Sequence, residues 1–193
     1  MGKKNPALKQ FIKSNYDYNL YCFKEYFDKI VSESGISKTD EFLQHGTTSR
    51  YLHSLSVAYY SYLLSIFIGN KANLKDIIRG GLAHDYFLYD SKVKDPQRHG
   101  HGKNHPKIAL ENAEKDFSLT DIERDIILKH MFPLTLTPPK YKESVIVSLV
   151  DKACAVYEFF VRKNPYPTLR HGLLGEEFKE NGQLLLQALA QKE

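Results

Sequence analysis

The chain has 193 residues, of which 42% are hydrophobic and 26% are charged, and its formal net charge at pH 7 is +4. This length and composition suit a single globular domain, residues 1–193, and exclude a disordered chain and a fibre. The net charge is only mildly positive, and the sequence lacks the dense Lys/Arg stripe of a dedicated nucleic-acid surface. Two cysteines without CxxC spacing, Cys22 and Cys154, argue against a disulfide scaffold and a thiolate zinc site.

The longest strongly apolar stretch is residues 57–69, which two serines interrupt and which is too short to span a bilayer. No apolar run follows the charged N-terminus, so no signal peptide is predicted. We therefore expect a cytoplasmic protein without a membrane partner.

Apolar residues recur at helical spacing along most of the chain, which predicts an all-α fold. The first expected helix covers residues 19–31. The second covers about residues 48–68, with Thr47 or Thr48 as its cap, and it is apolar on more than one face, which predicts a central position. The third covers about residues 74–88.

The polar segment 89–103 is then predicted to be a loop. A helix through about Phe117 follows, with Pro106 near its first turn, where the missing N–H costs least. Thr120 and Glu123 have the spacing of a capping box at the start of the next helix.

A strongly apolar helix is expected over about residues 141–161. A helical extension over about residues 165–193 would follow, with a helix at about residues 183–191. No segment indicates a strand.

Six ionisable side chains fall at helical positions that the apolar pattern predicts to be buried. They are His53, His84, Asp85, His105, His130 and Asp151. One histidine on an apolar face is more often a hydrogen-bonded core residue, but an unpaired buried carboxylate is costly. Because no Lys or Arg lies on the same faces at close spacing, a divalent cation would compensate both carboxylates and fix the imidazole tautomers.

The order H…HD…D, carried by His53, His84-Asp85 and Asp151, resembles the signature of the HD superfamily of metal-dependent phosphohydrolases. The resemblance covers about residues 42–160 and implies a compact helical bundle with its metal-binding core in that range. His105-Pro106 and His130 resemble two further ligands of the six-ligand branches. Those branches hold two metals and include the HD-GYP phosphodiesterases and the bacterial diadenosine tetraphosphate hydrolases.

By this resemblance one metal would be held by His53, His84, Asp85 and Asp151. Asp85 would bridge to a second metal held by His105 and His130. Nitrogen and oxygen ligands without thiolate suit iron, manganese, zinc, cobalt or nickel. Asp85 is also the candidate catalytic residue, because it can orient or deprotonate a water molecule.

Three cationic side chains are candidates for substrate binding: Arg50, Lys103 and Lys152. Each has an ordinary alternative, namely an ion pair for Arg50, a solvated loop for Lys103 and an exposed helix charge for Lys152. His45 and His171 are interpreted as structural or surface residues. Leu88 stands where the HD-GYP branch has a Lys that serves the leaving group, which argues against hydrolysis of a cyclic dinucleotide.

We therefore expect a metal-dependent phosphohydrolase that acts on a nucleotide or another small phosphorylated molecule. Two alternatives stay open. The HD fold also includes di-iron oxygenases similar to myo-inositol oxygenase, and it includes non-catalytic binding or sensor modules. A homo-oligomer is compatible with the sequence.

Overall fold

The computed structural model describes residues 6–69, 72–91, 93, 101–161 and 163–175. Their helices are α1 (Pro6–Ser32), the 3₁₀ helix η1 (Ile36–Glu41), α2 (Arg50–Phe67), α3 (Leu74–Ala83), α4 (His101–Asp116), α5 (Asp121–Lys129), α6 (Lys142–Phe160) and α7 (Pro167–Leu173). The one β-type pairing in this part of the chain is an isolated bridge between Leu43 and Ser49. The predicted all-α fold is confirmed.

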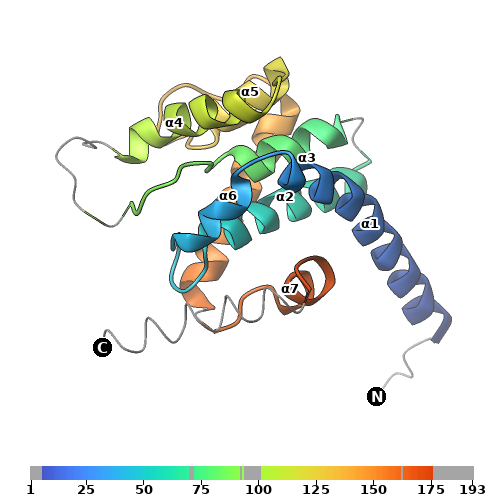
Figure 1. Cartoon of the computed structure of the whole chain (residues 1–193). Helices are drawn as coiled ribbons and strands as arrows, with labels where there is room; N and C mark the ends of the chain where they lie inside the picture. Colours follow the sequence, from blue (N-terminus) through green and yellow to red (C-terminus); the bar gives the residue numbers. More distant parts are fainter. Residues whose placement is uncertain (1–5, 70–71, 92, 94–100, 162, 176–193) are drawn as a thin grey trace.

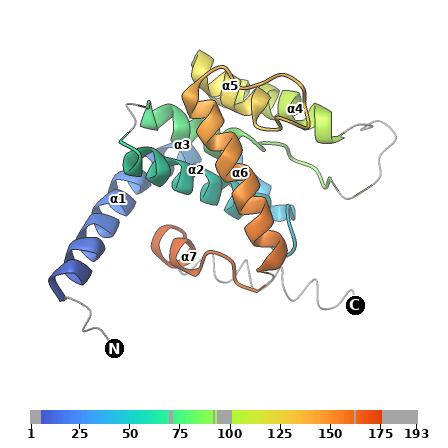
Figure 2. The ribbon, with the colours of Figure 1, turned by 180° about the vertical axis from the view of Figure 1, so that it is seen from behind.

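Helix α2 lies at the centre of the molecule, with α3 and α6 packed on it (Figure 1). Its inner positions, which include Leu52, Leu55 and Ala58, are fully buried. Helices α4 and α5 lie beyond α3, and α6 runs from beside α5 across α2 (Figure 2). A Cβ atom on Gly81 of α3 would lie 2.8 Å from the Cα atom of Ala58, so this glycine permits the close approach of α2 and α3.

The helix caps agree with the sequence in one place and differ in another. Thr120 and Glu123 form the predicted capping box of α5. The cap of α2 is Ser49 rather than Thr47 or Thr48, because the Ser49 hydroxyl accepts a hydrogen bond from the backbone N–H of Leu52.

Helix α3 ends at Ala83 rather than at about residue 88, and this corrects the predicted boundary. The apolar pattern continues, but His84 closes the helix because its Nδ1 atom lies 2.7 Å from the carbonyl oxygen of Gly81. The side chain thereby satisfies a carbonyl group that would otherwise lack a partner at the helix end. Asp85 consequently lies after the end of the helix rather than within it.

Helix α4 begins at His101, so residues 101–103 are helical rather than part of the predicted loop. Pro106 lies inside the helix, where it removes one i→i−4 hydrogen bond, instead of in the first turn. The remainder of the predicted loop beyond residue 93 lies outside the described residues, as does the helix predicted at residues 183–191. Helix α1 begins well before residue 19. No helix among the described residues has the length and apolar composition needed to cross a membrane.

Candidate metal centre

The six predicted ligands converge from five elements. His53 lies within α2, His84 and Asp85 follow α3, His105 lies on α4, His130 ends α5 and Asp151 lies within α6. All six are buried, with at most 9% of any residue exposed. The sequence therefore placed these side chains correctly in the interior, and the fold brings them to one place.

The first group of ligands surrounds the carboxylate of Asp151. Its Oδ1 atom lies 3.1 Å from Nε2 of His53 and 3.7 Å from Nε2 of His84. The same His84 nitrogen lies 3.5 Å from Oδ2 of Asp85. Four side chains from three segments thus bring their ligand atoms close together.

The second group lies on the other side of Asp85. Its Oδ1 atom is 3.2 Å from Nε2 of His105 and 3.6 Å from Nε2 of His130. The two imidazole nitrogens lie 2.9 Å apart. One oxygen of Asp85 therefore faces His84, and the other faces His105 and His130.

Two of the histidines are oriented by backbone carbonyl groups of their own helices. Nδ1 of His84 lies 2.7 Å from the carbonyl oxygen of Gly81, and Nδ1 of His130 lies 2.8 Å from that of Ile127. A carbonyl oxygen only accepts, so each Nδ1 carries the proton and each Nε2 presents a lone pair to the centre. Such outer contacts are typical of metal-ligating histidines.

Two buried atoms of the centre lack a hydrogen bond within the described residues: Nε2 of His84 and Oδ1 of Asp85. A buried polar atom without a partner is destabilising, so it requires an explanation. A divalent cation fits, because both atoms are ligand types for borderline metals and both face neighbouring ligands. The residues present therefore suit a divalent metal.

Electrostatics favour ionised carboxylates and a neutral His130 in this centre. Burial lowers the pKa of His53, but Glu158 and Asp151 raise it well above its usual value, so His53 must release a proton to bind a metal. Burial raises the pKa of Asp85, but the imidazoles around it, that of His84 most strongly, hold it well below its usual range. Burial also raises the pKa of Asp151, but the hydrogen bond from His53 lowers it to about 2. Burial lowers the pKa of His130 to about 4. At neutral pH the carboxylates are ionised and His130 is neutral.

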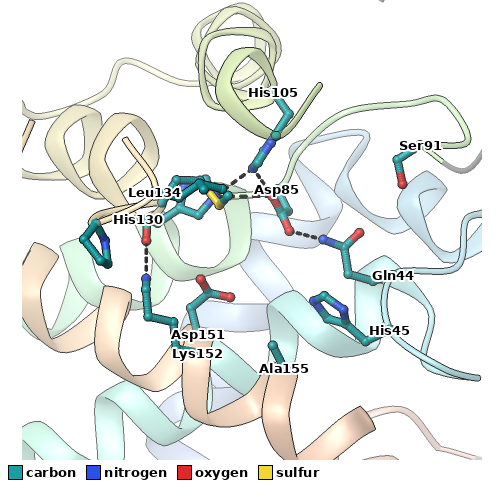
Figure 3. A pocket seen from close by; sticks show the side chains of 13 residues that line it. Gln44, His45, Asp85, Ser91, His105, His130, Leu134, Asp151, Lys152 and Ala155 are labelled. Atoms are coloured by element: carbon teal, nitrogen blue, oxygen red, sulfur yellow. Dashed lines mark hydrogen bonds and ion pairs between the residues drawn. The ribbon is translucent and has the colours of Figure 1, made fainter. Parts of the chain in front are cut away.

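A cavity of about 610 Å³ opens onto this centre (Figure 3). The ligands that line it are Asp85, His105, His130 and Asp151. Its other lining residues are Gln44, His45, Ser91, Gly102, Met131, Pro133, Leu134, Lys152 and Ala155. In Figure 3 the polar side chains of Gln44 and His45 lie across the cavity from Leu134. The centre is therefore buried in the protein but accessible from a space that can admit a small molecule.

The family model described as HD domain matches residues 50–155, which is more than half of the chain and contains all six ligands. The chain belongs to the HD domain family. Comparisons with the curated proteins and with the solved structures found no match. Membership in this family indicates a metal-dependent, hydrolase-type function.

Arg50 is the first residue of the region that matches the HD domain. It was expected to contact a phosphate group, but it does not line the cavity. It is fully buried, and its Nη1 atom donates to the carbonyl oxygens of Phe87 at 2.8 Å and Tyr89 at 3.2 Å. Its Nε atom donates to Oε1 of Gln44 at 3.0 Å, and the guanidinium lies 3.5 Å from the Phe87 ring centroid. The helical spacing from His53 was correct, but the long side chain extends to the segment after α3.

The two lysines differ in their access to the cavity of the HD domain. Lys152 lines it, and its ammonium donates to the carbonyl oxygen of His130 at 2.7 Å and to Ser148. Burial lowers the pKa of Lys152. Lys103 is exposed on α4 and is not among the residues that line the cavity. Leu88, at the position of the absent lysine, is 42% exposed and does not line it either.

Three residues at the centre were not predicted. Gln44 donates to Oδ2 of Asp85, and His45, expected to be structural or at the surface, lines the cavity. Glu158 is fully buried beside His53. Gln44 and His45 precede α2 in a segment without periodicity, so no pattern pointed to them. Glu158 did leave a signal, because it follows Asp151 by two helical turns on an apolar helix.

Proposed function

We propose that this HD domain is a hydrolase that cleaves a phosphate ester or anhydride of a small phosphorylated molecule, with two divalent ions as cofactors. The observation that carries the proposal is the carboxylate of Asp85, whose two oxygens face two separate sets of histidines. The adjacent cavity of about 610 Å³ supports a small-molecule substrate. The ligand set is compatible with iron, manganese, zinc, cobalt or nickel.

When bound, divalent ions lower the pKa of water and neutralise charge on a phosphoryl group. The chain's own residues supply position and proton transfer. Asp85 faces the cavity and is the group that orients the attacking water or accepts its proton. Lys152 adds a positive charge beside Asp151, where a phosphoryl oxygen would lie.

The cavity walls suit a substrate that has an uncharged part next to its phosphate. Met131, Pro133 and Leu134 form an apolar side, whereas Gln44 and His45 offer hydrogen-bonding groups on another. The flat, partly polar base and sugar of a nucleotide match such mixed walls. Leu88 stands where the HD-GYP branch has a lysine and does not line the cavity, so this position supplies no proton to a leaving group. A phosphate leaving group, which needs little protonation, suits such a centre.

A phosphate-release screen tests this proposal. The protein is loaded with Mn²⁺ or Fe²⁺ under anaerobic conditions and is supplied with nucleotides and dinucleoside polyphosphates. We expect phosphate release without oxygen and its loss on addition of a chelator. Absence of release from every phosphorylated compound, at full metal occupancy, would overturn the proposal.

A di-iron oxygenase is the second candidate, because four histidines and two aspartates without thiolate also suit a redox-active iron pair. Oxygen uptake coupled to substrate loss would support this alternative, since hydrolysis consumes no oxygen. A non-catalytic module is less well supported, because none of the six ligands is replaced.

A further inference from the structure

Glu158 is a fully buried carboxylate near the C-terminal end of α6. Its two oxygens lie 3.0 and 3.1 Å from Nδ1 of His53. The hydroxyl group of Tyr166 donates to Oε1 of Glu158 at 2.9 Å. Burial of a carboxylate is costly unless it is paired, so this contact constrains His53 strongly.

His53 differs in this respect from His84 and His130. Those two histidines direct Nδ1 to a carbonyl group three residues earlier in the same helix. His53 instead directs Nδ1 to a carboxylate that follows it by 105 residues. The orientation of His53 therefore depends on the packing of α6 and of the segment after it.

Tyr166 occupies an unfavourable backbone conformation. Its φ of 55° and ψ of 50° lie in the left-handed region, and Pro167 follows it. A non-glycine residue in this region is strained, and a following proline favours extended conformations instead. Such strain persists only where surrounding contacts compensate for it. The buried hydroxyl contact with Glu158 is one such contact.

We propose that Glu158, oriented by Tyr166, is a positioning residue for the first group of metal ligands. Glu158 accepts the Nδ1 proton of His53 and so leaves Nε2, which lies 3.1 Å from Oδ1 of Asp151, as the ring atom that would bind a metal ion. Glu158 and Tyr166 lie beyond residues 50–155, which match the family model. Residues that follow the matched region and precede α7 therefore contribute to the metal affinity of this chain. This inference rests on the metal centre of the proposed function.

The test compares Glu158→Gln and Tyr166→Phe with wild type in a competitive titration of Mn²⁺ or Zn²⁺ against a chromophoric chelator. Loss of such an outer contact typically lowers metal affinity about 10–100-fold. We expect a loss of this size for one of two bound ions in Glu158→Gln, and a smaller loss in the same direction for Tyr166→Phe. The second ion, held near His105 and His130, keeps its affinity.

Glu143→Gln is the matched control, because Glu143 is also buried on α6 but accepts from the backbone N–H of Asn73 away from the centre. We expect both of its metal affinities to equal those of wild type. Wild-type affinities in Glu158→Gln would overturn the inference, as would an equal loss for both ions in Tyr166→Phe. Failure of the wild type itself to bind a divalent ion would overturn the proposed function as well, so the two failures can be distinguished.

Discussion

The guanidinium of Arg50 is connected to the metal centre through hydrogen bonds. It donates to two carbonyl oxygens after α3 and to Gln44, which in turn donates to Asp85. Arg50→Ala leaves these buried acceptors without a donor. We expect the free energy of unfolding, measured by urea denaturation, to fall by about 2–4 kcal/mol. Lys103→Ala, at an exposed position, is the control and should change it by less than about 0.5 kcal/mol. Unchanged stability in Arg50→Ala would contradict the structural role.

Lys152 is the cationic side chain that the structure places at the cavity. Lys152→Met keeps most of the stem and removes the charge, and the carbonyl oxygen of His130 still accepts from Ser148. We expect kcat/KM for the substrate found by phosphate release to fall about 10–100-fold, the scale of one lost charge-assisted hydrogen bond. Metal content should not change. Loss of metal with unchanged kcat/KM per ion would instead make Lys152 a support for His130.

The burial of the six candidate ligands could be predicted from the sequence, for most of them because they interrupt an apolar helical pattern, and the resemblance supplied their grouping. Gln44 and His45 could not, since they precede α2 without any periodic context. The contacts of the Arg50 side chain also could not be predicted from the sequence. Its place on α2 follows from the sequence, but the direction of a long side chain depends on the backbone after α3.

At the scale of helices, the sequence predicted a helix boundary correctly where a capping side chain forms its usual hydrogen bond with the backbone. The capping box at Thr120 fixed the start of α5. The end of α3 was missed, because His84 satisfies a carbonyl group there and the apolar pattern runs on past it. The start of α4 was missed since Pro106 is tolerated inside the helix, contrary to the usual preference for its first turn.

The contact between α2 and α3 depends on Gly81. In Gly81→Ala the new Cβ atom would lie 2.8 Å from the Cα atom of Ala58, so the two helices must separate. Overpacking of this kind costs about 1–3 kcal/mol of unfolding free energy. Because His84 and Asp85 follow Gly81 closely, metal affinity should fall as well.

Gly102→Ala is the control for this prediction. Gly102 lies in α4, and a Cβ atom added to it would meet no atom closer than 3.8 Å. Alanine is favoured over glycine within a helix, so stability should stay equal or rise. Chemical denaturation and a metal titration of both variants measure the difference. Equal behaviour of the two alanine variants would mean that α2 and α3 can separate without cost.

At the scale of the whole molecule, the metal centre joins five elements, α2 through α6, that otherwise meet mainly through apolar side chains. Without a cation, the carboxylates of Asp85 and Asp151 are balanced by the imidazoles around them in a poorly solvated space. Because the ligands come from all five elements, metal binding should stabilise the entire bundle. Free metal at about 100 times Kd adds about 2.7 kcal/mol, which corresponds to about 5–10 °C in Tm for a chain of this size.

Asp85→Asn separates the two contributions to this stability. It removes the favourable interaction of the carboxylate with the surrounding imidazoles, so Tm in the presence of a chelator should fall, and the rise in Tm on adding metal should shrink as well. Asp116→Asn is the control: Asp116 accepts from Tyr86 and from the backbone N–H of Gly35 away from the centre, so this variant should lose Tm with and without metal but keep the full rise. Thermal melts with and without Mn²⁺ measure all three proteins. Two bound ions and an undiminished rise in Asp85→Asn would show that Asp85 is a hydrogen-bonded core residue and that the two groups of histidines act independently of its bridge.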